Sequence, residues 1–227
     1  MDEKVYGYMD WPRIEAIVYG EETAPRDVMG PRITQDGVLI QGFFPDAEEV
    51  SVISGKKTYV CEKEDEAGYF AVLLPVRKVP EYRFLIKMGE TEAECYDPYA
   101  FPCQITEEEE KAFCAGVYYE AYKKLGAHPV EIKGVKGTLF AAPNAVSVNI
   151  AGDFNGWIGR ATIMHRMPMS GIFELFVPGV EAGTHYKYEI KVKGGEVLLK
   201  ADPYGNSADH DPEGASVVAD VSAFQWN

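Results

Sequence analysis

Short apolar segments recur throughout this 227-residue sequence, and Gly, Pro, Asn or Asp interrupts them about every ten positions. Within the segments apolar and polar residues mostly alternate, as they do in strands that bury one face of a sheet. This pattern is typical of antiparallel β-sandwiches, so we predict an all-β fold. The expected strands are residues 38–44, 50–53, 69–74, 82–87, 137–141, 146–151, 172–177, 186–192 and 197–201.

The strand pattern occurs twice, with a period of about 104 residues. A period of this length corresponds to a whole domain, because solenoid units are much shorter. We therefore expect two copies of one β-sandwich in tandem. The matching segments are Gly68–Pro75 with Gly171–Pro178, Tyr82–Ile86 with Tyr186–Ile190, and Asp97–Tyr99 with Asp202–Tyr204.

A helix is predicted between the two copies. Thr106 can cap its first turn, Glu109 occupies the position that completes a capping box, and acidic residues fill that turn. Apolar residues then recur every fourth position, which predicts one long amphipathic helix that ends near Gly126. The members of this apolar stripe are Phe113, Val117, Ala121 and Leu125.

The predicted domain organisation is a sandwich over residues 1–105, a helical linker over residues 106–130 and a second sandwich over residues 131–227. An apolar stripe on the linker needs a surface to pack against. We therefore expect the helix to dock between the two sandwiches and to hold them in a fixed relation.

The charge balance limits the possible partners. With 22 Lys and Arg against 36 Asp and Glu, the net charge is -14 at pH 7. Such a chain repels phosphate backbones and anionic lipid surfaces, so we expect no nucleic-acid and no membrane partner. The polar, acidic start and the lack of any long apolar window predict a cytoplasmic protein.

Catalytic, cofactor and metal motifs are missing from the sequence. The four Cys form no CxxC pair and the four His no paired spacing, so we expect reduced thiols, no metal and no cofactor. No nucleophile elbow, P-loop or dinucleotide fingerprint occurs, and Asp209 and Asp211 are expected to be exposed loop charges. A (β/α)8 barrel typically needs about 250 residues, more than the whole sequence contains.

The segment Gly152–Trp157 is the most informative for function. Its Asp, Asn and Gly favour a tight turn, so its two aromatic residues point to opposite sides. Phe154 is expected in the core, whereas Trp157 either stacks on a sugar ring from an exposed loop or packs over the sandwich edge. Lys187 lies on the polar face of an alternating strand, where it either faces solvent or binds a sugar hydroxyl.

These motifs, taken together, resemble a known family. The second half is similar to the carbohydrate-binding family 48 domain of bacterial glycogen branching enzymes, which belong to glycoside hydrolase family 13. The first half resembles the extra N-terminal sandwich of the longer branching enzymes. The matching segments are Leu125–Pro129, Ala142–Ala145, Gly152–Trp157, Tyr186–Ile190, Lys200–Tyr204 and Asp220–Asn227 in the second half, and Gly42–Ala47 and Asp97–Pro102 in the first.

The resemblance implies two immunoglobulin-like, early-set β-sandwiches that form the non-catalytic N-terminal region of a 1,4-α-glucan branching enzyme. The family's catalytic barrel, with its Asp nucleophile and Glu acid/base, is not in these residues, so the chain alone is expected to be inactive. The implied partners are α-1,4-glucan or glycogen and that barrel. The implied carbohydrate-binding residues are Trp157, Lys187 and Asn155.

Two other functions remain open, namely a stand-alone module that targets a partner to glycogen and a structural interaction domain that binds no sugar. Glucan-binding relatives stack the sugar between two tryptophans. The position of the second tryptophan, near Val197 and Leu198, holds no aromatic residue here. The resemblance therefore implies weak binding that depends on the many chain ends of a branched polymer.

Overall fold

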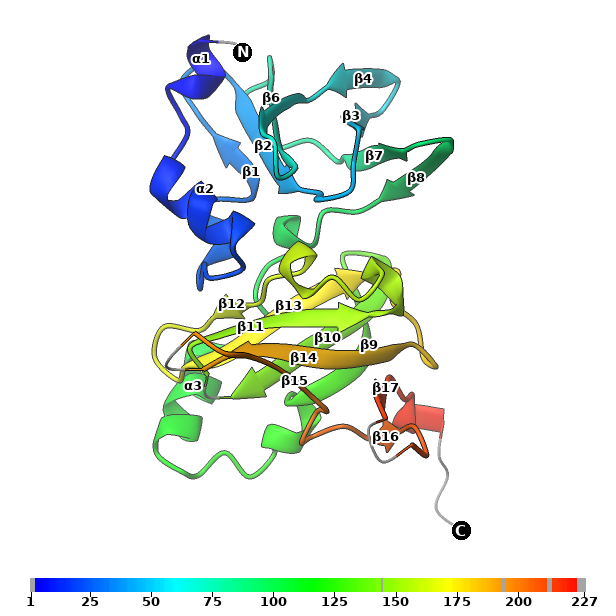
Figure 1. Cartoon of the computed structure of the whole chain (residues 1–227). Helices are drawn as coiled ribbons and strands as arrows, with labels where there is room; N and C mark the ends of the chain where they lie inside the picture. The colour runs from blue at the N-terminus through cyan, green and yellow to red at the C-terminus, as the bar shows by residue number, and fades with distance from the viewer. Residues whose placement is uncertain (1–2, 144, 193–194, 212–213, 224–227) are drawn as a thin grey trace. The chain divides into compact units, whose positions relative to one another are not determined.

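The computed structural model describes residues 3–143, 145–192, 195–211 and 214–223 (Figure 1). The chain divides into two compact units, Met1–Ala100 and Phe101–Asn227. Each unit contains two antiparallel sheets, which confirms the predicted all-β class. Every predicted strand is present, with ends that differ by at most two residues. In the described ranges, no helix is both long enough and apolar enough to cross a bilayer.

The first unit begins with short helices and continues as two four-stranded sheets. The helices are α1 (Glu3–Tyr6), α2 (Trp11–Val18) and the 3-10 turns η1 (Pro25–Asp27) and η2 (Pro98–Ala100). One sheet has the order β1 (Gly30–Ile33), β2 (Val38–Phe43), β6 (Tyr69–Leu74), β5 (Glu62–Asp65), and the other the order β4 (Lys57–Val60), β3 (Glu49–Ser54), β7 (Arg83–Met88), β8 (Thr91–Cys95).

Alternation along the strands produces the core of the first unit. Ile40 on β2 and Phe70 on β6 point from one sheet toward Val52 on β3 and Phe84 on β7 in the other, and all four are buried in one cluster. Burying side chains of this size stabilises the unit by roughly 1.5–3 kcal/mol each. The two sheets are therefore held together as a sandwich.

The second unit is also a pair of sheets preceded by short helices. The helices are α3 (Glu107–Cys114) and the 3-10 turns η3 (Ala121–Lys123), η4 (Asp153–Asn155), η5 (Gly159–Ala161) and η6 (Val221–Ala223). One sheet has the order β12 (His165–Arg166), β13 (Ile172–Pro178), β10 (Val135–Pro143), β9 (Gly126–Ile132), and the other the order β11 (Ser147–Gly152), β14 (His185–Lys191), β17 (Ser216–Val217), β16 (Ser207–Ala208), with β15 (Val197–Lys200) also paired to β14.

Aromatic side chains fill the second core. The ring of Phe140 on β10 meets the ring of Tyr186 on β14 with centroids 4.9 Å apart, so the contact joins the two sheets. Both side chains are fully buried. Edge contacts between rings at this separation contribute beyond the area that they bury.

The predicted long helix is wrong in its length. The capping box between Thr106 and Glu109 is present, but α3 ends at Cys114 and Gly116 follows in the left-handed region at φ 71°. The residues up to Leu125 form a loop and a 3-10 turn, and β9 begins at Gly126. Periodicity alone did not reveal this, because Phe113, Ala121 and Leu125 pack on one core cluster from three separate local structures.

The helix belongs to a repeated motif. In both units a helix of eight residues, a loop and a 3-10 turn precede the first strand, which begins at a glycine with positive φ. The backbone hydrogen bonds after the two helices recur at one constant offset. After α2, the backbone amides of Tyr19, Gly20 and Glu21 donate to the carbonyls of Glu15, Ile17 and Ala16, respectively. After α3, the amides of Ala115, Gly116 and Val117 donate in the same way to the carbonyls of Lys111, Phe113 and Ala112. We infer that α3 is the first element of the second repeat and is not a linker.

A Tyr–Asp hydrogen bond anchors the end of each repeat. The Tyr82 hydroxyl donates to the Asp97 carboxylate at 2.5 Å, and the Tyr186 hydroxyl donates to Asp202 at 2.6 Å. In each copy the other carboxylate oxygen accepts the amide of the residue two positions later, at 2.8 Å. The matching sequence segments therefore correspond to matching contacts.

Candidate functional site

The loop Gly152–Trp157 begins at the end of β11. It leads into a segment that runs back alongside β11. Gly156 and Trp157 both have left-handed backbone angles, at φ 61° and 64°. The Trp157 amide donates to the Gly152 carbonyl at 3.0 Å and closes the loop. A left-handed conformation is strained for a bulky residue such as tryptophan, and such strain is a reason to examine the site for function.

Asn155 holds this loop together through its side-chain amide. Its Oδ1 accepts the Gly152 amide at 3.0 Å, and its Nδ2 donates to the Ile150 carbonyl at 2.7 Å and to the Thr162 hydroxyl at 2.9 Å. Both amide hydrogens are thus used inside the protein. These bonds favour a positioning role for Asn155, and its predicted direct contact with sugar stays a prediction.

Trp157 is presented at the surface, with 41% of the residue exposed. Its indole Nε1 donates to Oδ1 of Asp153 at 3.2 Å. The other carboxylate oxygen of Asp153 accepts the His185 amide at 2.9 Å, which ties the loop to the start of β14. That amide, the indole and the His185 ring together lower the pKa of Asp153, so the carboxylate stays charged and keeps the indole oriented.

The second aromatic residue of the loop points the other way. The Phe154 ring lies 6.0 Å from the buried ring of Phe140, and Phe154 is only partly exposed. The expectation that one aromatic packs inward while the other is displayed is therefore met. Trp157 is 41% exposed, and its stacking on a sugar ring stays a prediction.

Lys187 lies next to this loop on the outer face of the β11–β14 sheet. It is directly opposite Ala151, and Glu189 on the same strand is opposite both Asn149 and Leu199. Residues opposite one another in an antiparallel pair share a face. Lys187, Glu189 and Leu199 therefore point to one side of the sheet, where the Glu189 carboxylate accepts the Asn149 amide at 3.0 Å.

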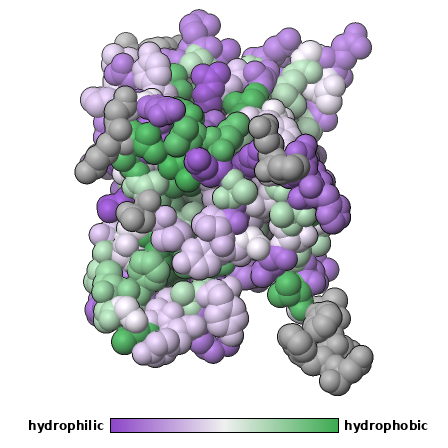
Figure 2. Space-filling model, turned by 60° about the horizontal axis from the view of Figure 1, so that its bottom comes forward, coloured by the Kyte–Doolittle hydropathy of each residue, from purple (hydrophilic) through white to green (hydrophobic). Residues whose placement is uncertain are grey.

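The edge strand β15 adds an aliphatic strip to this face. Val197 and Leu199 are each 54% exposed, opposite Lys191 and Glu189 on β14. Figure 2 shows apolar side chains, in green, gathered in patches on the face turned toward the viewer. The outer face of this sheet thus combines charged hydrogen-bonding groups with an aliphatic strip along β15, and the exposed indole of Trp157 follows the end of β11.

The sequence predicted part of this arrangement. Trp157 and Lys187 are on adjacent structures, at the end of β11 and the start of β14. Asp153 and Leu199 were missed. The acidic residue that opens a Gly–Asp–Phe–Asn–Gly turn signals a side-chain hydrogen bond, but nothing in the sequence indicated that it would orient the indole.

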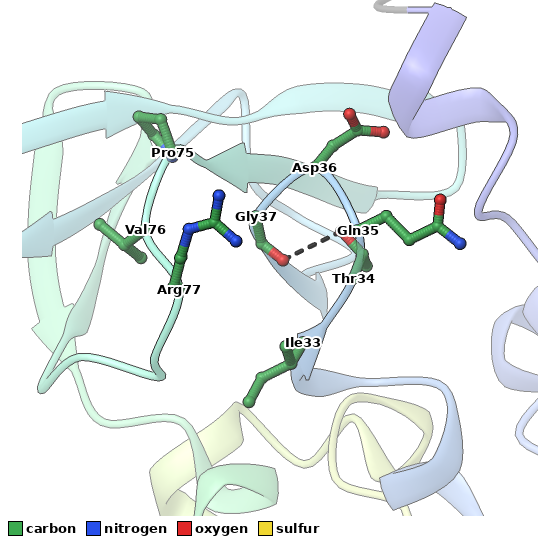
Figure 3. A pocket seen from close by; sticks show the side chains of 8 residues that line it. All are labelled: Ile33, Thr34, Gln35, Asp36, Gly37, Pro75, Val76 and Arg77. Atoms are coloured by element: carbon green, nitrogen blue, oxygen red, sulfur yellow. Dashed lines mark hydrogen bonds between the residues drawn. The ribbon is translucent and has the colours of Figure 1, made fainter.

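A cavity in the first unit has a different character. Its volume is about 270 Å3, and it lies between the β1–β2 turn and the segment after β6 (Figure 3). Thr34 donates from its hydroxyl to the Gly37 carbonyl at 2.9 Å within its wall, and the Arg77 guanidinium points toward that turn. None of its lining residues is aromatic, so it offers no stacking platform for a sugar. The lining residues are Ile33, Thr34, Gln35, Asp36, Gly37, Pro75, Val76 and Arg77.

Comparison with protein families gives two matches that together span most of the chain. Residues 10–99 match the N-terminal domain of the α-1,4-glucan branching enzyme GlgB. Residues 124–205 match carbohydrate-binding module 48, the isoamylase N-terminal domain. The loop at Trp157 and the strand at Lys187 both lie inside the second match.

Two GlgB relatives agree with these matches. A 1,4-α-glucan branching enzyme GlgB from Saccharophagus degradans is 40% identical over 94% of this chain and 30% of its own length. The GlgB of Trichodesmium erythraeum is 38% identical over 95% of this chain and 29% of its own length. A solved pullulanase complexed with maltotetraose, from Anoxybacillus sp. LM18-11, is 16% identical over 84% of this chain and 26% of that chain, with a TM-score of 0.36.

The chain thus spans less than a third of the length of these GlgB relatives. The region that matches is their N-terminal part, because the first domain model is that of the GlgB N-terminal domain. Phe224–Asn227 and Asn144, which belong to two of the segments that resemble the family, lie outside the described residues. From the two family matches and the relatives, the chain is similar to the N-terminal region of GlgB branching enzymes, with a match to the GlgB N-terminal domain followed by a match to carbohydrate-binding module 48.

Proposed function

We propose that this chain holds α-1,4-glucan for a branching enzyme and binds it at the surface around Trp157. The observation that carries the proposal is the exposed indole of Trp157, which a strained loop and a hydrogen bond to Asp153 keep in place. A fixed planar ring can stack on the apolar face of a sugar with little loss of side-chain entropy. Lys187, beside the loop, would donate hydrogen bonds to sugar hydroxyls.

A neutral polysaccharide suits the electrostatics of the chain. The net charge of -14 disfavours phosphate-rich or other anionic ligands, whereas a glucan carries no charge. Trp157 offers one aromatic ring, and β15, in the same sheet as Lys187, offers Leu199 instead of a second ring. We therefore expect each contact to be weak and the binding of branched polymers to depend on many chain ends.

A catalytic domain is the second partner that we propose for this chain. The GlgB relatives extend well beyond the region that this chain matches. We propose that the two units pack against the catalytic barrel of such an enzyme and deliver glucan to it, and that the isolated chain has no branching activity. The cytoplasmic location and the lack of nucleic-acid and membrane partners stay predictions from the sequence.

Electrophoresis in native gels that contain glycogen tests the binding. The chain is expected to be retarded as the glycogen concentration rises, and Trp157→Ala is expected to remove most of the retardation. Tyr19→Ala is a matched control, because Tyr19 is an exposed aromatic residue of the first unit. Near-ultraviolet circular dichroism and thermal unfolding of each variant check that the fold is intact.

Two results would contradict the proposal. If saturating glycogen does not retard the wild-type chain, a structural interaction domain without sugar binding becomes the better account. If Trp157→Ala leaves the retardation unchanged, the glucan contacts lie elsewhere. Branching activity of the purified chain, measured by the change in the iodine absorption of amylose, would contradict the claim that it acts only together with a catalytic domain.

A further inference from the structure

Two exposed tyrosines that the proposed glucan surface does not use follow α3, Tyr119 in the loop before η3 and Tyr122 within η3. Tyr119 is 83% exposed and Tyr122 is 63% exposed. Among the described residues, Tyr119 is the most exposed large hydrophobic side chain. Aromatic rings this exposed contribute little to the core, so core packing does not account for them.

The backbone beneath these rings is fixed. The Tyr118 hydroxyl donates to the Glu109 carboxylate at 2.7 Å, and Glu109 also completes the capping box of α3. Ala121 packs against the core cluster that contains Leu125. The Lys124 ammonium donates to the Gln104 carbonyl at 3.0 Å. The loop is therefore anchored on both sides of the exposed rings.

The two exposed tyrosines lie close together along the chain. Tyr119 lies in a turn that leads directly into η3, and the amides of Ala121 and Lys123 donate to the carbonyls three residues before them. Tyr122 lies within η3, three positions after Tyr119. The two residues are therefore presented as a pair by one short, hydrogen-bonded segment.

The charges around the pair point to a neutral ligand. Glu120 forms an ion pair with Lys123, whose ammonium also lies 6.0 Å from the centroid of the Tyr122 ring. The first turn of α3 adds exposed acidic residues nearby in the sequence. An anionic ligand would be repelled, and the paired charges interrupt the continuous apolar area that a stable protein interface needs.

We propose that Tyr119 and Tyr122 form a second contact site for α-glucan on the same unit as Trp157. This inference rests on the proposed glucan binding and extends it. Two preorganised sites on one chain would bind separate branches of the same polymer, which raises the apparent affinity without a deep pocket. Each tyrosine hydroxyl also offers a hydrogen bond at the rim of the ring.

The test uses glycogen-containing native gels with the combined substitution Tyr119→Ala and Tyr122→Ala. We expect the glycogen concentration for half-maximal retardation to rise about tenfold, because one of two linked contacts is lost. Tyr19→Ala is the matched control, because Tyr19 is also an exposed tyrosine. It directly follows α2, as Ala115 directly follows α3. The substituted tyrosines are exposed, so the variant is expected to fold, and circular dichroism checks this.

Retardation equal to that of the wild type, while Trp157→Ala still removes it, would overturn the second site and leave the proposed function intact. A wild-type chain that is not retarded would overturn both. A titration of the 15N-labelled Trp157→Ala variant with maltoheptaose separates them further. Saturable shifts of the amides of residues 117–123 are expected, and their absence would exclude direct contact at the tyrosines.

Discussion

Substitution of Asp97 should change how the stability of the first unit depends on pH. Asp97 is 2% exposed, and burial raises its pKa from 3.8 to about 6, although the Tyr82 hydroxyl and the Tyr99 amide, both bonded to it, oppose the change. A carboxyl with a higher pKa in the folded than in the unfolded chain binds its proton more tightly when folded. Its contribution to the free energy of unfolding is therefore full below pH 4 and falls as the pH rises to about 6.

The magnitude follows from the two pKa values. Each pKa unit corresponds to about 1.4 kcal/mol, so the change from 3.8 to about 6 corresponds to about 3 kcal/mol. Asp97→Asn cannot titrate and removes this pH-dependent part. The substitution also weakens the hydrogen bonds with Tyr82 and Tyr99, but that cost is the same at each pH. Because the unfolded carboxyl is already partly ionised at pH 4, the free energy of unfolding of the wild type minus that of Asp97→Asn should fall by about 2 kcal/mol of this total between pH 4 and pH 7.

Urea denaturation at several pH values measures this difference. Replacing Trp157 and Trp226 by Phe in both proteins leaves Trp11 as the only tryptophan, so its fluorescence reports the unfolding of the first unit. Asp46→Asn removes the same charge from an exposed position and controls for the change in net charge. A difference that stays constant within about 1 kcal/mol from pH 4 to pH 7 would refute the reasoning.

Three further predictions concern the second unit. Asn155→Ala should lower the free energy of unfolding of the second unit by roughly 2 kcal/mol in urea denaturation, since three hydrogen bonds are lost. It should also weaken glycogen retardation, and unchanged values of both quantities would contradict the positioning role of Asn155. Gly126→Ala should lower the midpoint of thermal unfolding more than Gly134→Ala does. Both glycines have positive φ, but only at Gly126 would the added Cβ lie 2.7 Å from the Tyr204 carbonyl oxygen. Equal shifts of the midpoint would argue against that contact. Leu199→Trp should strengthen glycogen retardation by adding a second ring to the outer face, and weaker retardation would place the glucan elsewhere.

The strands and the repeat could be predicted because their signals are local. Alternation with period two defines each strand, and the Tyr82 and Tyr186 segments recur together with their Asp partners. The end of α3 could not be predicted by periodicity, because Leu125 continues the apolar stripe from a different element. Gly116 was the contrary signal, since a left-handed glycine ends a helix.

The candidate site was only partly predictable. The composition of the Gly152–Trp157 loop indicated that one aromatic would be displayed, and Trp157 is indeed exposed. The role of Asp153 depends on a hydrogen bond to His185, which is distant along the chain. Contacts of that kind depend on the tertiary fold and leave no periodic pattern in the sequence.

The central claim is that Trp157 contacts α-glucan, and an NMR titration tests it most directly. The indole resonance of Trp157, assigned with Trp157→Phe, is followed while maltoheptaose is added to the 15N-labelled chain. We expect a saturable shift of this resonance and of the Lys187 amide resonance, whereas the Trp11 indole resonance is expected not to shift. An unchanged Trp157 resonance at saturating maltoheptaose would contradict it.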